Sequence, residues 1–279
     1  MTAELTRLQA LLRPLCREGI ALAFSGGVDS TLLLAVLAQL RKEAPFPLLA
    51  LTAGTDLLEV KELENVRALA ASYAVPHEVL RCDVFQIPEV RHNDPRRCYF
   101  CKKALFSAML RRAREKGIAV LAEGSHADDL KSYRPGRQAL AELGVLSPLL
   151  QAGLGKPEIR ALARELGIAV AEKPAAPCLA TRFDYGTLLT EEKLKQAAAG
   201  EAFLRSVLDS GIDLRLRVHG TLARIEVPPA LFPAVTARSG EIVKKLRELG
   251  FERVTLDLAG FRSGGFDDRF TEKGAEKNV

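Results

Sequence analysis

The fold is decided by residues 22–30, which read Leu22-Ala23-Phe24-Ser25-Gly26-Gly27-Val28-Asp29-Ser30. A short apolar run ends in a Gly-Gly turn, and a helical pattern follows it. The two glycines let the backbone approach an anion closely. The first amides of the following helix point at that anion, and the helix dipole favours negative charge there. Ser25 and Ser30 add hydroxyl donors, so we expect a phosphate-binding loop between a strand and a helix.

The string Ser-Gly-Gly-Val-Asp-Ser resembles the PP-loop, the pyrophosphate-binding loop of enzymes that split ATP into AMP and pyrophosphate. The G-x-x-x-x-G-K-[ST] loop of other ATPases is absent, because Gly155-Lys156 lacks both the upstream glycine and the following Ser or Thr. The resemblance implies ATP as a cofactor. The residues expected to hold it are Ser25, Gly26, Gly27, Asp29 and Ser30.

Composition limits the class of protein. The chain has 279 residues, of which 48% are apolar, so it can bury a sizeable core. Its 40 Lys and Arg residues against 35 Asp and Glu give a charge of +5, which suits phosphate-bearing ligands but does not demand nucleic acid. No apolar stretch approaches the roughly 20 residues of a membrane span, and the N-terminus does not read as a secretory signal. We expect a cytoplasmic protein with neither a membrane nor a nucleic-acid partner.

Residues 18–172 alternate between strand and helix patterns. The expected strands are 19–24, 47–53, 78–82, 118–122 and a short fifth at 145–150. Such alternation predicts an α/β fold with a doubly wound parallel sheet. Ligands bind at the carboxyl ends of the strands in these sheets, which is where the loop at 25–30 lies.

The segment 173–186 interrupts this pattern, because it contains two prolines and no clear period. We therefore predict a first domain at 1–186. A smaller C-terminal α+β domain is expected at 187–262, with strands at 214–218, 223–227 and 253–258. Residues 263–279 have little to bury and are predicted to be a flexible tail.

The five cysteines divide into two groups. Cys16 and Cys82 lie in apolar periodic segments and are expected to be small buried hydrophobes. Cys98 and Cys101 form a C-x-x-C, which fits a redox pair, half of a zinc site or part of an iron–sulfur site. A redox pair normally opens the first helix of its fold, and a zinc site needs a fourth ligand. With Cys178 as the third thiolate, the set also suits a 4Fe–4S cluster that has one open iron.

Four segments carry a more specific resemblance, namely residues 93–102, 123–129, 132–136 and 174–183. Together they resemble the LarE family of ATP-dependent sacrificial sulfur transferases, which help to build the nickel-pincer nucleotide of lactate racemase. The resemblance covers roughly residues 15–260. It implies that ATP adenylates a carboxylate of pyridinium-3,5-biscarboxylic acid mononucleotide and releases pyrophosphate. A sulfur nucleophile then displaces AMP and leaves a thiocarboxylate.

The resemblance implies two sources for the sulfur. In one branch of the family the cysteine matching Cys178 gives up its own sulfur and becomes dehydroalanine. In the other branch three cysteines hold a 4Fe–4S cluster that delivers an added sulfide. Because this chain has Cys98, Cys101 and Cys178, we favour the cluster branch, with Cys178 as the residue at the reaction centre.

Charged residues supply the other candidates. Asp29, Asp128 and Asp129 are oxygen donors that suit Mg²⁺, although loop acids are as often only solvated. Four arginines are expected to bind the phosphate or carboxylate of the substrate, and these are Arg182, Arg215, Arg217 and Arg224. For Arg215, Arg217 and Arg224 the alternative is one charged face of an amphipathic sheet. Glu226 reads as a metal ligand or as an ion-pair partner of these arginines.

Three rival functions remain at this point. Some tRNA thiolases use the same loop and a three-cysteine cluster, but this function needs a broad basic surface. An ATP-dependent amidotransferase would not need the three cysteines. A regulatory protein would bind ATP without releasing pyrophosphate. The favoured partner is a small nucleotide substrate, and self-association into a homo-oligomer is expected.

Overall fold

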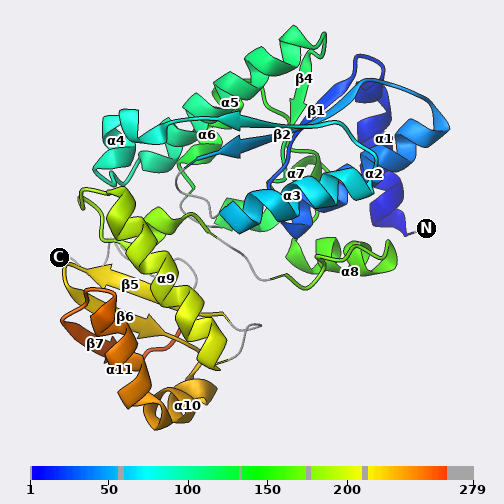
Figure 1. Ribbon diagram of the computed structural model, residues 1–279. Coiled ribbons are helices and arrows are strands. Elements are labelled where there is room, and N and C mark those ends of the chain that lie inside the picture. Colours follow the sequence, from blue (N-terminus) through cyan, green and yellow to red (C-terminus); the bar gives the residue numbers. More distant parts are fainter. Residues whose placement is uncertain (1, 56–59, 132–133, 174–176, 209–212, 263–279) are drawn as a thin grey trace, which may run out of the picture. The chain divides into compact units, whose positions relative to one another are not determined.

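The computed structural model describes residues 2–55, 60–131, 134–173, 177–208 and 213–262 (Figure 1). The chain forms two compact units. The first contains Met1–Ile87 and Arg96–Lys173, and the second contains Pro88–Pro95 and Pro174–Val279. The predicted boundary after residue 186 falls inside the second unit, and the inclusion of residues 88–95 there was not anticipated. Whether the units fold as separate domains stays a prediction, and the tail expected at 263–279 lies outside the described residues.

The first unit is built on a parallel sheet of four strands. These strands are β1 (Ile20–Ala23), β2 (Leu48–Gly54), β3 (His77–Arg81) and β4 (Val120–Ala122). Their order is β3-β2-β1-β4, and every neighbouring pair is parallel. β1 lies where the strand order reverses, so the loop that follows it opens at the switch point of the sheet, where α/β proteins bind ligands.

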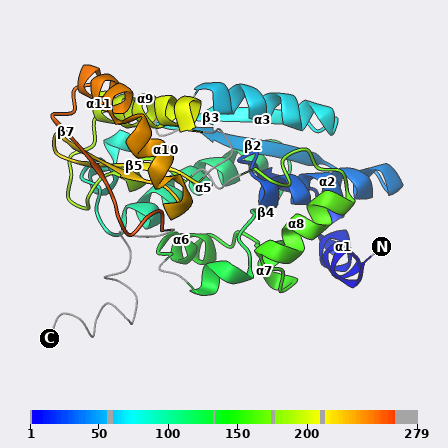
Figure 2. The same ribbon diagram turned by 90° about the horizontal axis from the view of Figure 1, so that it is seen from below.

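Helices cover both faces of this sheet, as the alternation of strands and helices predicted. One face packs against α1 (Ala3–Cys16), α2 (Val28–Glu43), α3 (Val60–Ser72), α7 (Pro148–Gln151) and α8 (Lys156–Glu165). The other packs against α5 (Arg97–Glu115) and α6 (Gly136–Glu142). Within β1, Ile20 and Leu22 enter the first core and Ala21 enters the second, the period of two expected for a strand. Figure 2 shows α8 beside α2, with which it is in contact.

The predicted fifth strand at 145–150 is wrong. Leu146 forms an isolated parallel bridge with Ala122, and the chain then turns into α7 at Pro148. Proline has no backbone N–H to extend a ladder, and its fixed φ suits the first turn of a helix. The other strands of the first unit lie within two residues of their predicted bounds.

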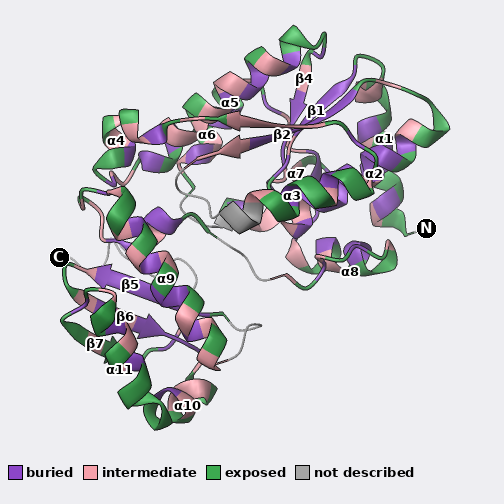
Figure 3. Cartoon of the chain, viewed as in Figure 1, coloured by how far each residue is buried: buried purple, intermediate pink, exposed green. Residues whose placement is uncertain are grey.

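The second unit contains a sheet of three strands. These are β5 (Arg215–His219), β6 (Leu222–Glu226) and β7 (Arg253–Leu256), in the order β5-β6-β7. β5 and β6 are antiparallel, and β6 and β7 are parallel. The helices are α4 (Pro88–Arg91), α9 (Glu191–Leu208), α10 (Phe232–Ala237) and α11 (Ser239–Glu248). Figure 3 shows β5 as buried along most of its length.

Several short turns complete the chain. They are the 3₁₀ segments η1 (Val84–Gln86), η2 (Ala127–Lys131), η3 (Leu179–Arg182) and η4 (Pro229–Leu231). Within the described part of the chain, no helix has both the length and the apolar character that a membrane span requires.

Candidate functional site

The phosphate loop, defined here as residues 25–30, joins β1 to α2 and is closed by its own hydroxyl groups. The Ser25 and Ser30 Oγ atoms lie 3.2 Å apart, and the Ser25 amide donates to Ser30 Oγ at 3.3 Å. Ser30 Oγ in turn donates to the Gly27 carbonyl at 3.2 Å. Gly27 is the N-cap of α2 and has no side chain to occupy the first amides of that helix. The helix terminus therefore presents its amides and its positive dipole end toward the loop.

Two glycines make close approaches at this loop. Gly26 has φ +70°, and a Cβ placed there would lie 2.7 Å from Cγ2 of Val66 on α3. Gly124 follows β4, and a Cβ there would lie 3.2 Å from both Cβ of Asp29 and the amide nitrogen of Ser30. The segment after β4 thus packs directly on the phosphate loop, as neighbouring carboxyl strand ends of a parallel sheet should.

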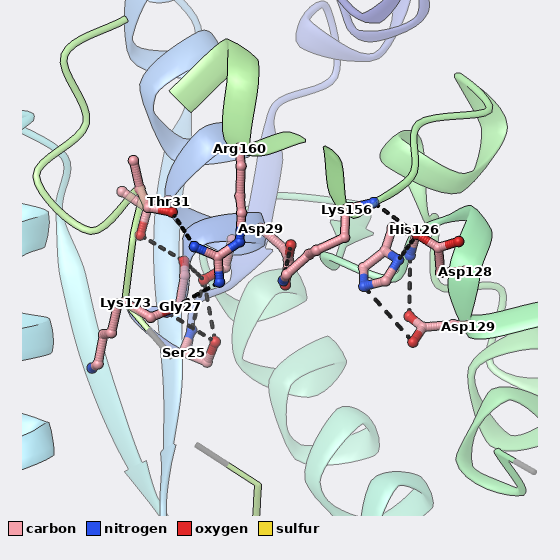
Figure 4. A network of polar contacts seen from close by, with 12 residues as sticks. Ser25, Gly27, Asp29, Thr31, His126, Asp128, Asp129, Lys156, Arg160 and Lys173 are labelled. Atoms are coloured by element: carbon pink, nitrogen blue, oxygen red, sulfur yellow. Dashed lines mark hydrogen bonds and ion pairs between the residues drawn. The ribbon is translucent and has the colours of Figure 1, made fainter. Parts of the chain in front are cut away.

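Lys156 connects two of the predicted acids (Figure 4). Its Nζ donates to Asp29 Oδ1 at 2.7 Å and to Oδ2 at 2.8 Å. Its backbone amide, at the start of α8, donates to Asp128 Oδ2 at 2.8 Å. Asp128 therefore caps α8, and a cation is held at the edge of the phosphate loop.

Sequence reasoning set Lys156 aside together with the unmatched ATPase loop. A signal was nevertheless present, because Lys156 occupies the first position of a helix. A cation there opposes the positive end of the helix dipole, so its presence calls for a partner outside the helix. That partner, Asp29, lies 127 positions away in the sequence, and no local pattern identifies it.

The other predicted acid, Asp129, is 8% exposed. Its Oδ2 accepts the amide of His126 at 3.1 Å, and its Oδ1 lies 3.0 Å from a guanidinium nitrogen of Arg134. Over the described residues, no group of three or more His, Cys, Asp or Glu side chains is placed to hold a metal ion. Two of the acids expected to bind Mg²⁺ lie against basic side chains, Asp29 against Lys156 and Asp129 against Arg134.

Cys98 and Cys101 lie in the first turns of α5. Cys98 is exposed and Cys101 is half-buried. Residues three apart share a helix face, so the two thiols belong to one side of α5. A Cβ at Gly136, the first residue of α6, would lie 3.2 Å from the Cys98 carbonyl oxygen, which shows how closely α6 approaches this turn.

Cys16 and Cys82 differ from this pair. Burial raises the pKa of each thiol above its ordinary value, which disfavours the thiolate. Both are half-buried rather than fully buried. Cys16 packs against the larger core of the first unit, in agreement with its expected role.

Cys178 lies in the second unit, in an exposed position immediately before η3. Its carbonyl oxygen accepts from the amide of Thr181 at 3.0 Å and from Thr181 Oγ1 at 2.8 Å. Arg182 is 4% exposed and forms a bidentate ion pair with Glu201 on α9, with both N···O distances at 2.8 Å. The side chain of Arg182 is therefore fixed by protein partners.

The other predicted arginines lie on one face of the sheet of the second unit, together with Glu226. Arg217 donates to Glu226 Oε2 at 3.0 Å, and Arg224 donates to Glu226 Oε1 at 3.1 Å. The guanidinium carbon Cζ of Arg215 lies over the ring of Phe261, 5.1 Å from its centroid. Burial, and secondly the charge of Arg182, lower the pKa of Arg215 to about 10, so it stays a cation at neutral pH.

The charged sheet face considered from the sequence is present, but most of its charged side chains are buried. Arg215 and Arg217 are each 5% exposed and Glu226 is 4% exposed. The structure thus brings together Arg182, Cys178 and the arginines of β5 in the second unit. The phosphate loop and the Cys98–Cys101 pair belong to the first unit.

Known proteins resemble this chain over most of its length. The PP-loop domain family matches residues 1–133. The chain is 37% identical to an uncharacterized protein of Synechocystis sp. over 245 residues, covering 87% of this chain and 90% of that protein. It is 34% identical to the pyridinium-3,5-bisthiocarboxylic acid mononucleotide synthase of Lactiplantibacillus plantarum over 265 residues, covering 95% of this chain and 94% of the synthase.

A more distant match is a tRNA-specific 2-thiouridylase of Acetivibrio thermocellus. It is 26% identical and covers 66% of this chain and 62% of the thiouridylase. The identity and the coverage are both lower than for the synthase. The chain therefore belongs to the PP-loop family that includes the pyridinium-3,5-bisthiocarboxylic acid mononucleotide synthase.

Proposed function

We propose that this protein is an ATP-dependent sulfur transferase that converts a carboxylate of pyridinium-3,5-biscarboxylic acid mononucleotide to a thiocarboxylate, in the biosynthesis of the nickel-pincer nucleotide. The observation that carries the proposal is the 34% identity to the synthase over nearly the whole of both chains. The geometry of the phosphate loop supports the ATP-dependent step.

Adenylation makes the substrate carboxylate reactive. A carboxylate repels nucleophiles and has no good leaving group. Its oxygen attacks the α-phosphorus of ATP, the bond to the β-phosphate breaks, and pyrophosphate leaves. The phosphate loop and the N-terminus of α2 stabilise the charge that develops on pyrophosphate. Mg²⁺ accompanies ATP as a hard cation with oxygen ligands.

Lys156 supplies the cation that the phosphate loop lacks in its own sequence. Its side chain and that of Asp29 are both partly exposed, at 31% and 24%, so the ammonium group remains accessible to an anion. We assign it to the β- and γ-phosphates, with Asp29 exchanging its lysine partner for the metal of Mg-ATP. The arginines of β5, Arg215 and Arg217, are assigned to the anionic groups of the mononucleotide, and Glu226 orients Arg217.

The sulfur donor is the second part of the proposal. We propose that Cys98, Cys101 and Cys178 hold a 4Fe–4S cluster, because all three are thiol ligands and two of them are exposed. When bound, such a cluster would supply an exchangeable sulfide at its open iron. Cys98 and Cys101 share one helix face, which fits two ligands of one cluster.

The cluster is tested by anaerobic reconstitution with iron and sulfide. We expect broad absorption in the blue-violet region and about four irons per chain. The variants Cys98→Ala, Cys101→Ala and Cys178→Ala should each lower the iron content sharply, whereas Cys16→Ala and Cys82→Ala should not. A colourless protein that binds one zinc ion tightly would contradict the proposed cluster.

The origin of the sulfur is tested by intact-mass spectrometry after reaction with ATP, Mg²⁺ and the pyridinium mononucleotide. With a cluster, Cys178 keeps its thiol and turnover repeats when sulfide is supplied. If Cys178 is itself the donor, each chain loses about 34 Da, the mass of H₂S, in a single turnover that needs a reactive, exposed cysteine.

One assay separates this function from its rivals. Pyrophosphate release is measured with the pyridinium mononucleotide, with tRNA and with neither. Release that depends on the mononucleotide supports the proposal, and release that depends on tRNA would replace it with tRNA thiolation. A cytoplasmic location, self-association and the lack of a nucleic-acid partner stay predictions.

A further inference from the structure

The side chain of Arg182 holds the backbone on which Cys178 is carried. NH1 donates to the Pro177 carbonyl at 2.8 Å, to the Cys178 carbonyl at 3.3 Å and to Thr181 Oγ1 at 3.0 Å. Nε and NH2 donate to the two carboxylate oxygens of Glu201. All three guanidinium nitrogens thus bind groups of the second unit.

Glu201 is itself fixed from a second direction. It is 6% exposed, and its Oε1 also accepts the amide of Leu216 on β5 at 3.0 Å. A buried bidentate pair of this kind has a defined geometry, because the planar guanidinium matches the carboxylate. The position of Arg182 is therefore set by α9 and β5 together.

The turn receives a further donor from the sheet. Arg217 NH1 donates to the Thr181 carbonyl at 2.6 Å. Leu179 and Ala180, which follow Cys178, are buried at 9% and 1% exposure. Cys178 itself is exposed. The structure therefore combines a fixed backbone with an exposed cysteine.

From this geometry we infer that Arg182 is a positioning residue for Cys178, with Glu201 as the group that orients Arg182. The inference rests on the proposed function in assigning Cys178 to sulfur delivery. It replaces the expectation that Arg182 grips a substrate anion. A displacement of about 1 Å in a reacting group can reduce a rate by about two orders of magnitude, so the fixed turn matters for the chemical step.

Glu201→Gln tests the inference with little change in volume. Glutamine offers one oxygen acceptor, and its NH₂ group would face Arg182 NH2 as a second donor. We expect hydrogen exchange of the Thr181 amide to accelerate at least about tenfold as the turn opens locally. The matched control is Glu78→Gln, which disrupts the bidentate pair of Glu78 with Arg112 in the first unit and should leave this amide unchanged.

Kinetics separate positioning from substrate binding. In Glu201→Gln, kcat for sulfur transfer should fall about 10- to 100-fold, while KM for the mononucleotide and single-turnover pyrophosphate release remain within about twofold of wild type. Arg182→Lys keeps the charge but not the fork of donors, and it should show the same losses. If Arg182→Lys fails to fold, as judged by circular dichroism, the kinetics of Glu201→Gln still distinguish positioning from substrate binding.

Two results would overturn the inference. One is unchanged exchange of the Thr181 amide in Glu201→Gln. The other is a large rise in KM with reduced pyrophosphate release, which would identify Arg182 as a substrate ligand. If the wild-type protein does not thiolate the mononucleotide, the proposed function fails, but hydrogen exchange still measures whether Arg182 and Glu201 hold the turn.

Discussion

The phosphate loop of the first unit and the arginine-bearing sheet face of the second, both of which we propose to bind substrate anions, are built in different ways. The loop presents backbone amides and hydroxyl groups, and its internal hydrogen bonds join residues at most five positions apart. The sheet face uses full charges held by buried carboxylates, such as Glu226 between Arg217 and Arg224. Local geometry builds the first site, whereas the second depends on partners from separate elements.

The largest effect is expected in the phosphate loop. Gly26→Ala introduces a Cβ at φ +70° that would lie 2.7 Å from Val66 Cγ2, so the loop must move. We expect pyrophosphate release to fall at least about 100-fold, because the donors lose their alignment. The control is Gly144→Ala, which has φ +67° but open space around the new Cβ and should retain release. Equal losses in both variants would attribute the effect to backbone strain alone.

On the sheet face, Glu226→Gln removes the charge between two arginines that face each other across β5 and β6. Because Glu226 and Arg217 are buried, we expect a loss of about 3 kcal/mol in the free energy of unfolding, measured with urea. Glu241→Gln breaks an exposed ion pair with Arg238 in the same unit and should have no measurable effect. If both variants lose the same free energy of unfolding, burial does not determine how much an ion pair contributes to stability.

The first unit also contains an ion pair between residues far apart in the sequence, that of Lys156 with Asp29. Lys156→Ala should raise KM for ATP or lower the rate of pyrophosphate release by about 10- to 100-fold, the usual worth of a charge-assisted hydrogen bond. Lys42→Ala removes the same charge at the far end of α2 and serves as the control. Normal ATP kinetics in Lys156→Ala would restrict this lysine to holding Asp29.

The smallest effect concerns the Glu78–Arg112 pair, which is partly exposed. The hydrogen bond from Arg112 holds the pKa of Glu78 below its ordinary value of 4.5. A depressed carboxyl pKa contributes stability above the unfolded value, and this is lost as the pH falls through the folded value. The Tm of wild type should exceed that of Glu78→Gln by about 2 °C or less at pH 7. The difference should shrink below pH 4.5, and a difference that grows in acid would contradict the sign.

The contrast between the two regions explains what the sequence could predict. The four strands of the first unit, and the order of strand, glycine turn and helix at residues 20–43, follow from patterns within about ten residues and were predicted correctly, whereas the strand at 145–150 was not. There Leu146 pairs as expected, but Pro148 ends the pairing. Arg215, Arg217 and Glu226 were also proposed from the sequence, and their binding role stays a prediction.

The side-chain contacts between distant residues could not be predicted in the same way. The Asp29–Lys156 contact spans 127 positions, and the Arg182–Glu201 pair joins a turn to a helix. Both depend on how elements pack after they form. An arginine that binds a substrate and one that binds a glutamate look identical in a sequence, and only the packing distinguishes them.

The inclusion of Pro88–Pro95 in the second unit has a consequence for synthesis on the ribosome. Asn93 in that segment is fully buried, has φ +49°, and donates to the carbonyls of Phe183 and Asp184. At about 5–20 residues per second, Phe183 is added roughly 4.5 to 18 s after Asn93, because 90 positions separate them. For that interval the nascent chain carries an early piece of its second unit without the carbonyls that Asn93 binds. A fragment ending at residue 173 would remain in this state permanently.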